Sequence, residues 1–102
     1  MVLLMRAISP DTLPVAVLEA SYALGKLAAA SRKAAKISQV ELCGRVGISR
    51  QTLNQIERGS PRVQLAHWLV VLDQFGLMDS LVRSLSASQA GRIAEAIPRS
   101  RR

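Results

Sequence analysis

The stretch Gln39–Arg58, which reads QVELCGRVGISRQTLNQIER, decides the fold of this chain. It begins inside the pattern Ser38-Gln39-Val40-Glu41, a capping box that is typical of a helix start. Gly47 suits the left-handed position at which that helix ends, and Ser49 is a good cap for a following helix. The stretch therefore predicts two short helices, joined by a turn of three or four residues.

Apolar residues in this stretch fall where the two helices would touch. They are Leu42, Cys43, Val46, Ile48, Leu53 and Ile56. Cys43 lies where a close crossing needs a small side chain, so we expect it to pack rather than to react. Gly47 gives the backbone the freedom that the turn requires. This pattern indicates two helices that cross steeply around a small aliphatic contact.

With those apolar positions turned inward, the second helix presents a polar stripe to the outside. The stripe comprises Arg50, Gln51, Asn54 and Arg58, flanked by Ser49, Thr52 and Gln55. Arginine can bond guanine through two atoms in the major groove, and asparagine or glutamine can do the same with adenine. We therefore expect these seven residues to bind double-stranded DNA.

Helical patterns flank this pair on both sides. A long helix is expected from about Val15 to Ala35, with Leu18, Tyr22, Leu24, Leu27, Ala28 and Ala35 on its inner stripe. A glycine in a helix interior costs about 1 kcal/mol, so Gly25 favours a helix that starts near Tyr22 rather than at Val15. Two further helices are expected, one over about 64–75, with Leu65, Trp68, Leu69 and Leu72 on one face, and one over about 78–85.

The predicted organisation is all-α, with five helices in a single domain over residues 15–85. An N-terminal arm covers residues 1–14, and a flexible basic tail covers residues 86–102. A weak helix between Ser88 and Ile97 is the alternative for part of that tail. A chain of this size buries one modest core, and pairing often stabilises such small proteins.

Positive charge is concentrated in the middle of the chain. The formal net charge is +7, and residues 26–62 alone carry eight basic residues against two acidic ones, a net +6. A basic block inside a folded segment points to a polyanionic partner. The single cysteine and the single histidine, Cys43 and His67, leave no metal cluster, and we expect no metal and no cofactor.

No residues stand at catalytic spacing, so the sequence predicts no enzyme. His67 is interpreted as a surface or groove residue. The apolar run from Val2 to Met5 is too short for a signal-peptide core, and no stretch approaches the ~20 apolar residues of a membrane span. We expect a cytoplasmic protein, on or near the chromosome.

Residues 22–78 resemble the XRE family of helix-turn-helix domains, which includes the Cro and phage-repressor proteins. The shared positions are Gln39, Cys43 (where the family usually has alanine), Gly47-Ile48-Ser49, Leu53, Ile56 and Glu57-Arg58-Gly59. The resemblance implies a five-helix domain whose third helix enters the major groove.

By the same resemblance, Gln39 is expected to hydrogen-bond a DNA phosphate and, in addition, to brace a recognition side chain. Arg50, Gln51 and Asn54 read bases, while Gln55 and Arg58 make further base or phosphate contacts. It also implies a structural ion pair between Arg32 and Glu57. Nearby basic residues are candidate phosphate contacts that position the domain. They are Lys33, Lys36, Arg45 and Arg62.

The segment from Glu57 to Leu77 resembles the subset of this family that acts as antitoxins. Those proteins partner HipA-like kinase toxins and repress their own operon. The resemblance implies an autorepressing antitoxin of a type II toxin–antitoxin pair. We also expect a homodimer, and the operator of a two-fold dimer is an inverted repeat. Two alternatives remain open: a stand-alone repressor of a phage or mobile element, and an interaction module that has lost DNA binding.

Overall fold

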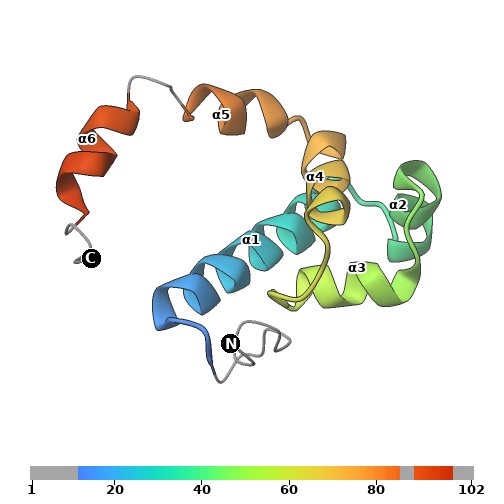
Figure 1. Ribbon diagram of the computed structural model, residues 1–102. Coiled ribbons are helices and arrows are strands. Elements are labelled where there is room, and N and C mark those ends of the chain that lie inside the picture. Colours follow the sequence, from blue (N-terminus) through green and yellow to red (C-terminus); the bar gives the residue numbers. More distant parts are fainter. Residues whose placement is uncertain (1–11, 86–88, 98–102) are drawn as a thin grey trace.

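The computed structural model describes residues 12–85 and 89–97, and within these ranges the chain is all-α (Figure 1). Its helices are α1 (Val15–Ala34), α2 (Gln39–Val46), α3 (Arg50–Glu57), α4 (Leu65–Gln74), α5 (Met78–Arg83) and α6 (Gln89–Ala96). Five of them are the expected ones. None of the helices in the described ranges is long and apolar enough to cross a membrane.

The boundaries of α2 and α3 follow from local hydrogen bonds. The Ser38 Oγ atom accepts a bond from the backbone N–H of Glu41 at 3.0 Å, and α2 ends at Gly47, whose φ is 77°. The Ser49 Oγ atom likewise accepts from the backbone N–H of Thr52 at 3.0 Å. Each cap satisfies a backbone donor that the first turn of a helix leaves unpaired.

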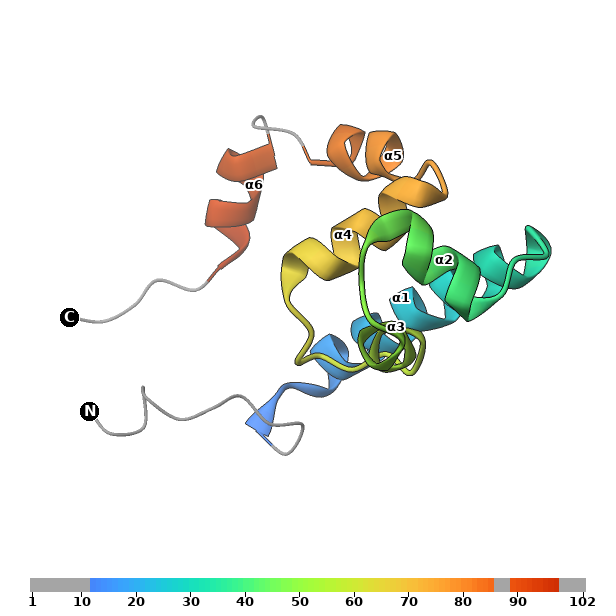
Figure 2. The same cartoon turned by 90° about the vertical axis from the view of Figure 1, so that its right-hand side faces the viewer.

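Helices α1, α2, α3 and α4 share one hydrophobic core. Its buried members are Ala28, Leu42, Cys43, Leu53, Ile56, Trp68 and Val71. Val46 and Ile48 pack against this cluster and are themselves half-buried, as the turn between α2 and α3 requires. The core holds α2 and α3 at a steep angle to each other, and α1 packs against α3 (Figures 1 and 2).

The backbones of α1 and the end of α3 approach each other closely at two glycines. A Cβ atom added to Gly25 would stand 2.5 Å from the carbonyl oxygen of Ile56 and 2.6 Å from the backbone nitrogen of Gly59. Gly59 has a φ of 79°, and a Cβ there would stand 2.5 Å from Tyr22 Cα. The expectation that Gly25 delays the helix start was wrong, because α1 is continuous from Val15 and the glycine is needed for contact.

Two expected inner faces differ from the structure. On α1, Tyr22, Leu24 and Leu27 are exposed, because the helix meets α3 through the narrow face that carries Gly25 and Ala28. On α4, Leu65 is 69% exposed, while Trp68 is buried. Leu65 is the first residue of α4, so it lies at the edge of the core rather than over it.

The expected tail contains a helix. Residues 89–96 form α6, which corresponds to the weak helix that the sequence left open, and none of its residues is buried. In both views α6 lies apart from the body formed by α1 to α4 (Figures 1 and 2). The rest of that tail, residues 86–88 and 98–102, and residues 1–11 of the arm lie outside the described residues.

Candidate nucleic-acid interface

Helix α3 has one buried and one exposed face. Leu53 and Ile56 are fully buried, which fixes the rotation of this two-turn helix about its axis. The opposite side carries the expected polar stripe, and its members are all exposed: Arg50, Gln51, Asn54, Gln55 and Arg58. These residues define the reading ridge. The structure thus presents amide and guanidinium groups together on a helix that α1 and α2 support from behind.

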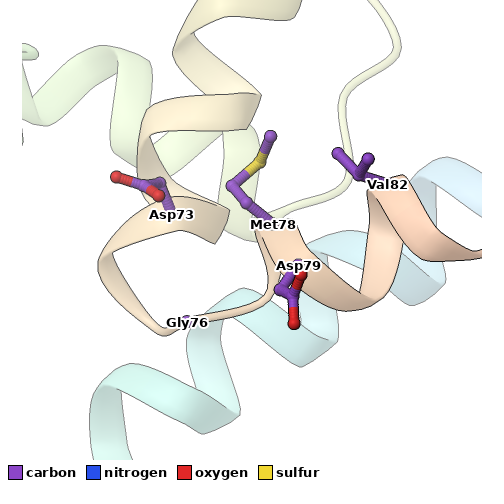
Figure 3. A pocket seen from close by; sticks show the side chains of 5 residues that line it. All are labelled: Asp73, Gly76, Met78, Asp79 and Val82. Atoms are coloured by element: carbon purple, nitrogen blue, oxygen red, sulfur yellow. The ribbon is translucent and has the colours of Figure 1, made fainter.

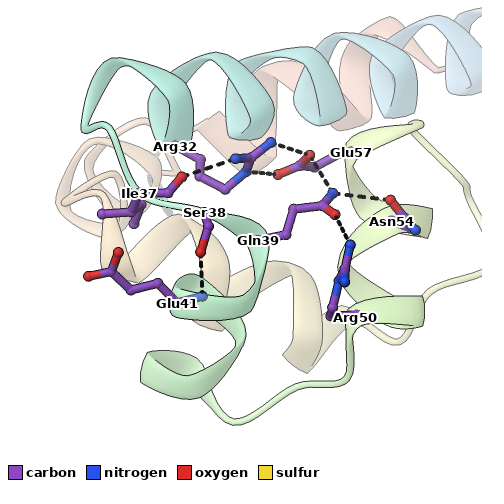
Figure 4. A network of polar contacts seen from close by, with 8 residues as sticks. All are labelled: Arg32, Ile37, Ser38, Gln39, Glu41, Arg50, Asn54 and Glu57. Atoms are coloured by element: carbon purple, nitrogen blue, oxygen red, sulfur yellow. Dashed lines mark hydrogen bonds and ion pairs between the residues drawn. The ribbon is translucent and has the colours of Figure 1, made fainter.

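A chain of polar contacts links this ridge to the interior (Figure 4). The Gln39 Nε2 atom donates to Asn54 Oδ1 and to Glu57 Oε1, each at 3.1 Å. Arg50 Nη2 in turn donates to Gln39 Oε1 at 3.3 Å. Gln39, at the start of α2, therefore touches both Arg50 and Asn54 on the ridge. The bracing role that the family resemblance implied has a geometric basis here, and the additional bond to Glu57 was not anticipated.

An ion pair at the base of this network joins α1 to α3. Arg32 Nε lies 2.7 Å from Glu57 Oε2, and Arg32 Nη2 donates to Glu57 Oε1 at 3.1 Å. The two side chains are only 12% and 10% exposed, so solvent screens them weakly. Arg32 Nη1 also donates to the carbonyl oxygen of Ile37 at 3.0 Å, in the turn before α2. One guanidinium thus connects three elements: α1, the α1–α2 turn and α3.

The electrostatics of this pair favour its charged form. The hydrogen bond to Glu57 raises the pKa of the Arg32 guanidinium, and the negative charge of Glu57 adds to this against the opposing effect of burial. No buried side-chain nitrogen or oxygen in the described chain lacks a hydrogen-bond partner. The pair and its neighbours are therefore a satisfied structural unit rather than a reactive one.

The expected contacts at the start of α3 are partly engaged in capping. Ser49 Oγ donates to Thr52 Oγ1 at 3.0 Å while it caps the helix, and Thr52 is half-buried. Their hydroxyl groups hold the first turn of α3 together. Ser49 is exposed and directly precedes the ridge residues Arg50 and Gln51 in the chain.

The four candidate phosphate contacts differ in their surroundings. Lys33 is in the last turn of α1, and Lys36 follows in the turn, with a φ of 62°. Arg45 forms an ion pair with Glu41 at 2.7 Å, and both side chains are about half exposed. Arg62 is exposed in the α3–α4 loop. The ion pair with Glu41 already partly neutralises the charge of Arg45, and this distinguishes Arg45 from the other three candidates.

Two remaining features carry no chemistry of their own. Burial raises the pKa of the Cys43 thiol, and the side chain is part of the core, so its thiolate is disfavoured.

A hollow of about 450 Å³ lies at the α4–α5 corner, and the carboxylates of Asp73 and Asp79 lie beside it with Met78 and Val82 (Figure 3). Two carboxylates repel phosphate. No group of three metal-ligating side chains occurs within residues 12–85 and 89–97, and His67 is half-buried.

Comparison with known proteins agrees with this geometry. The model of a family described as a helix-turn-helix domain matches residues 23–85. The match spans α2, α3, α4 and α5 entirely and most of α1. No curated protein and no solved structure matches the chain significantly.

Proposed function

The chain belongs to the family of helix-turn-helix domains, and on this premise we propose that it is a sequence-specific transcriptional regulator that reads double-stranded DNA. Helix α3 enters the major groove, and the reading ridge contacts base edges. The observation that carries this proposal is the ridge itself, because its polar groups are exposed while the opposite face of α3 is fully buried. Arg50, Gln51 and Asn54 are the proposed base-reading residues.

Exposed basic residues outside α3 support a phosphate-binding rim. Lys33, Lys36 and Arg62 are exposed and belong to the basic block of residues 26–62. Such residues bind the backbone of any duplex and make affinity fall with salt. They position the domain, whereas the ridge supplies the sequence preference. An interaction module that had lost DNA binding would not need this organised set of donors.

Selection of bound duplexes from a random pool tests the proposal. The natural chain should enrich one motif, and Arg50→Ala should weaken the preference at one base pair by about 1–3 kcal/mol. Arg92→Ala is the matched control, because it removes the same charge from α6, away from the ridge. Equal loss on every sequence in the Arg50→Ala protein would mean that Arg50 touches phosphate only. Absence of any enriched motif for the natural chain would refute the proposal.

We further propose a homodimer on an inverted-repeat operator. Support comes from apolar side chains that the single chain leaves uncovered. They line a groove of about 370 Å³ between α1, α4 and α5, with Leu24, Val63, Leu65, Leu69 and Leu81 among its walls. Half-sites one helical turn apart, ~34–36 Å, are expected. Sedimentation of a monomer at micromolar concentration, with full affinity for an isolated half-site, would contradict the dimer.

The finer proposal is that this regulator is an autorepressing antitoxin, paired with a HipA-like kinase toxin. It rests on the sequence of the segment from Glu57 to Leu77, and it places the protein at the chromosome in the cytoplasm. Co-expression with the product of an adjacent kinase-like reading frame tests it, and a stable complex that binds the operator is the expected result. A chromosomal neighbourhood without such a frame would favour the stand-alone repressor.

A further inference from the structure

The charge of Glu57 determines which way the amide of Gln39 faces. A carboxylate in an ion pair with a guanidinium only accepts hydrogen bonds, so the atom of Gln39 that faces Glu57 Oε1 at 3.1 Å must be the donor Nε2. The amide oxygen then points to the other side, where it accepts from Arg50 Nη2 at 3.3 Å. The reverse orientation would place Gln39 Oε1 against a carboxylate oxygen and leave Arg50 facing an amide NH₂ group.

The orientation of Gln39 in turn fixes that of Asn54. Gln39 Nε2 also donates to Asn54 Oδ1 at 3.1 Å, so the oxygen of Asn54 is turned toward α2. Figure 4 shows the Nδ2 group of Asn54 on the side away from Gln39. Arg50 has five N–H donors and no acceptor, and Gln39 engages only one of its nitrogens. The outer edges of Arg50 and Asn54 therefore offer hydrogen-bond donors alone.

A ridge of donors discriminates among bases. Guanine presents two neighbouring acceptors in the major groove, N7 and O6, whereas adenine and cytosine present an amino group there, and thymine presents a single acceptor, O4, beside its methyl group. Bidentate recognition of adenine needs the oxygen and the NH₂ group of an asparagine side by side at the base. That oxygen is turned toward Gln39 in this protein.

From this geometry we propose that Arg50 and Asn54 both select guanine. Gln39 is the positioning residue that sets the preference of Asn54, and the ion pair of Glu57 with Arg32 directs Gln39. The inference rests on the proposed function, and it names the bases that the site takes. It predicts an operator half-site with guanine at the positions that face Arg50 and Asn54.

Selection from random duplexes with three proteins tests the inference. Asn54→Ala identifies the position that Asn54 reads, because the preference there should disappear. At that position the natural chain should favour guanine over adenine by about tenfold. In Gln39→Met, which keeps the side-chain length and leaves the ion pair in place, Asn54 is free to turn its oxygen outward. The guanine preference at that position should then fall by about tenfold in favour of adenine, while guanine at the Arg50 position should persist.

The controls separate a positioning role from loss of structure. Gln64→Met makes the same exchange at an exposed residue before α4 and should keep the natural motif. Thermal melting should show that all variants fold. Adenine at the Asn54 position in the natural chain, or an unchanged motif in Gln39→Met, would overturn this inference while leaving DNA binding intact. Absence of preference for any duplex would overturn the proposed function itself, and this inference with it.

Discussion

Replacing Gly25 by alanine should destabilise the protein, although alanine is the better helix former. The added methyl group would lie 2.5–2.8 Å from the backbone of Ile56 and Gly59, so α1 and α3 must separate. Overpacking in a core costs about 1–3 kcal/mol. The upper end applies here, because the atoms in the way are backbone atoms that cannot change rotamer. The gain in helix propensity offsets about 1 kcal/mol of this cost.

The net loss is therefore about 2 kcal/mol, which for a domain of this size corresponds to a fall in Tm of roughly 8–16 °C. Thermal unfolding of the full chain, followed by far-ultraviolet circular dichroism, measures it. Gly44→Ala is the matched control, because Gly44 lies inside α2 with nothing within 4 Å of an added Cβ. That variant should gain up to about 1 kcal/mol. A Gly25→Ala protein as stable as the natural chain would refute the close contact between α1 and α3.

Three other results are expected. Arg32→Met should cost about 3–5 kcal/mol in the free energy of unfolding, because it leaves Glu57 nearly buried without its partner; chemical denaturation measures this, and a loss below 1 kcal/mol would contradict it. Lys33→Ala should weaken binding to all duplexes alike and lower the slope of log K against log salt by about 1, whereas Arg45→Ala should change the slope less, because Glu41 already pairs with it. The Cys43 thiol should react with iodoacetamide only as the protein unfolds, and rapid labelling of the folded protein at pH 8 would contradict its burial. Because burial raises the pKa of this thiol in the folded state, its contribution to the free energy of unfolding is present below about pH 9 and is lost as the pH rises further.

Local signals explain why much of the fold was predictable. Ser38, Gly47 and Ser49 act through bonds or φ angles within three or four residues, so the sequence near them contains the whole reason for the helix boundaries. Leu53 and Ile56 were also predictable as core residues. They are the two large apolar residues of α3, so the sequence leaves no doubt about which face of this helix is buried.

Long-range contacts explain the errors. Apolar residues occur on more than one side of α1, and its sequence does not say which side meets α3. By every local rule Gly25 weakens a helix. Its missing side chain lets α1 approach the backbone of Ile56 and Gly59, which lie more than thirty residues further along the chain. The direction of the Gln39 amide likewise depends on Glu57, which is 18 residues away. The polar stripe of the candidate site could be predicted, but the orientation of its groups could not.

Methylation interference on a selected duplex tests most directly whether α3 reads the major groove. Dimethyl sulfate modifies guanine at N7, in the major groove, and adenine at N3, in the minor groove. Premethylated guanines in the half-site should block binding, and Arg50→Ala should abolish the interference at one of them, while methylated adenines should have no effect. Interference at adenine N3 alone would place the protein in the minor groove and contradict the role assigned to the ridge.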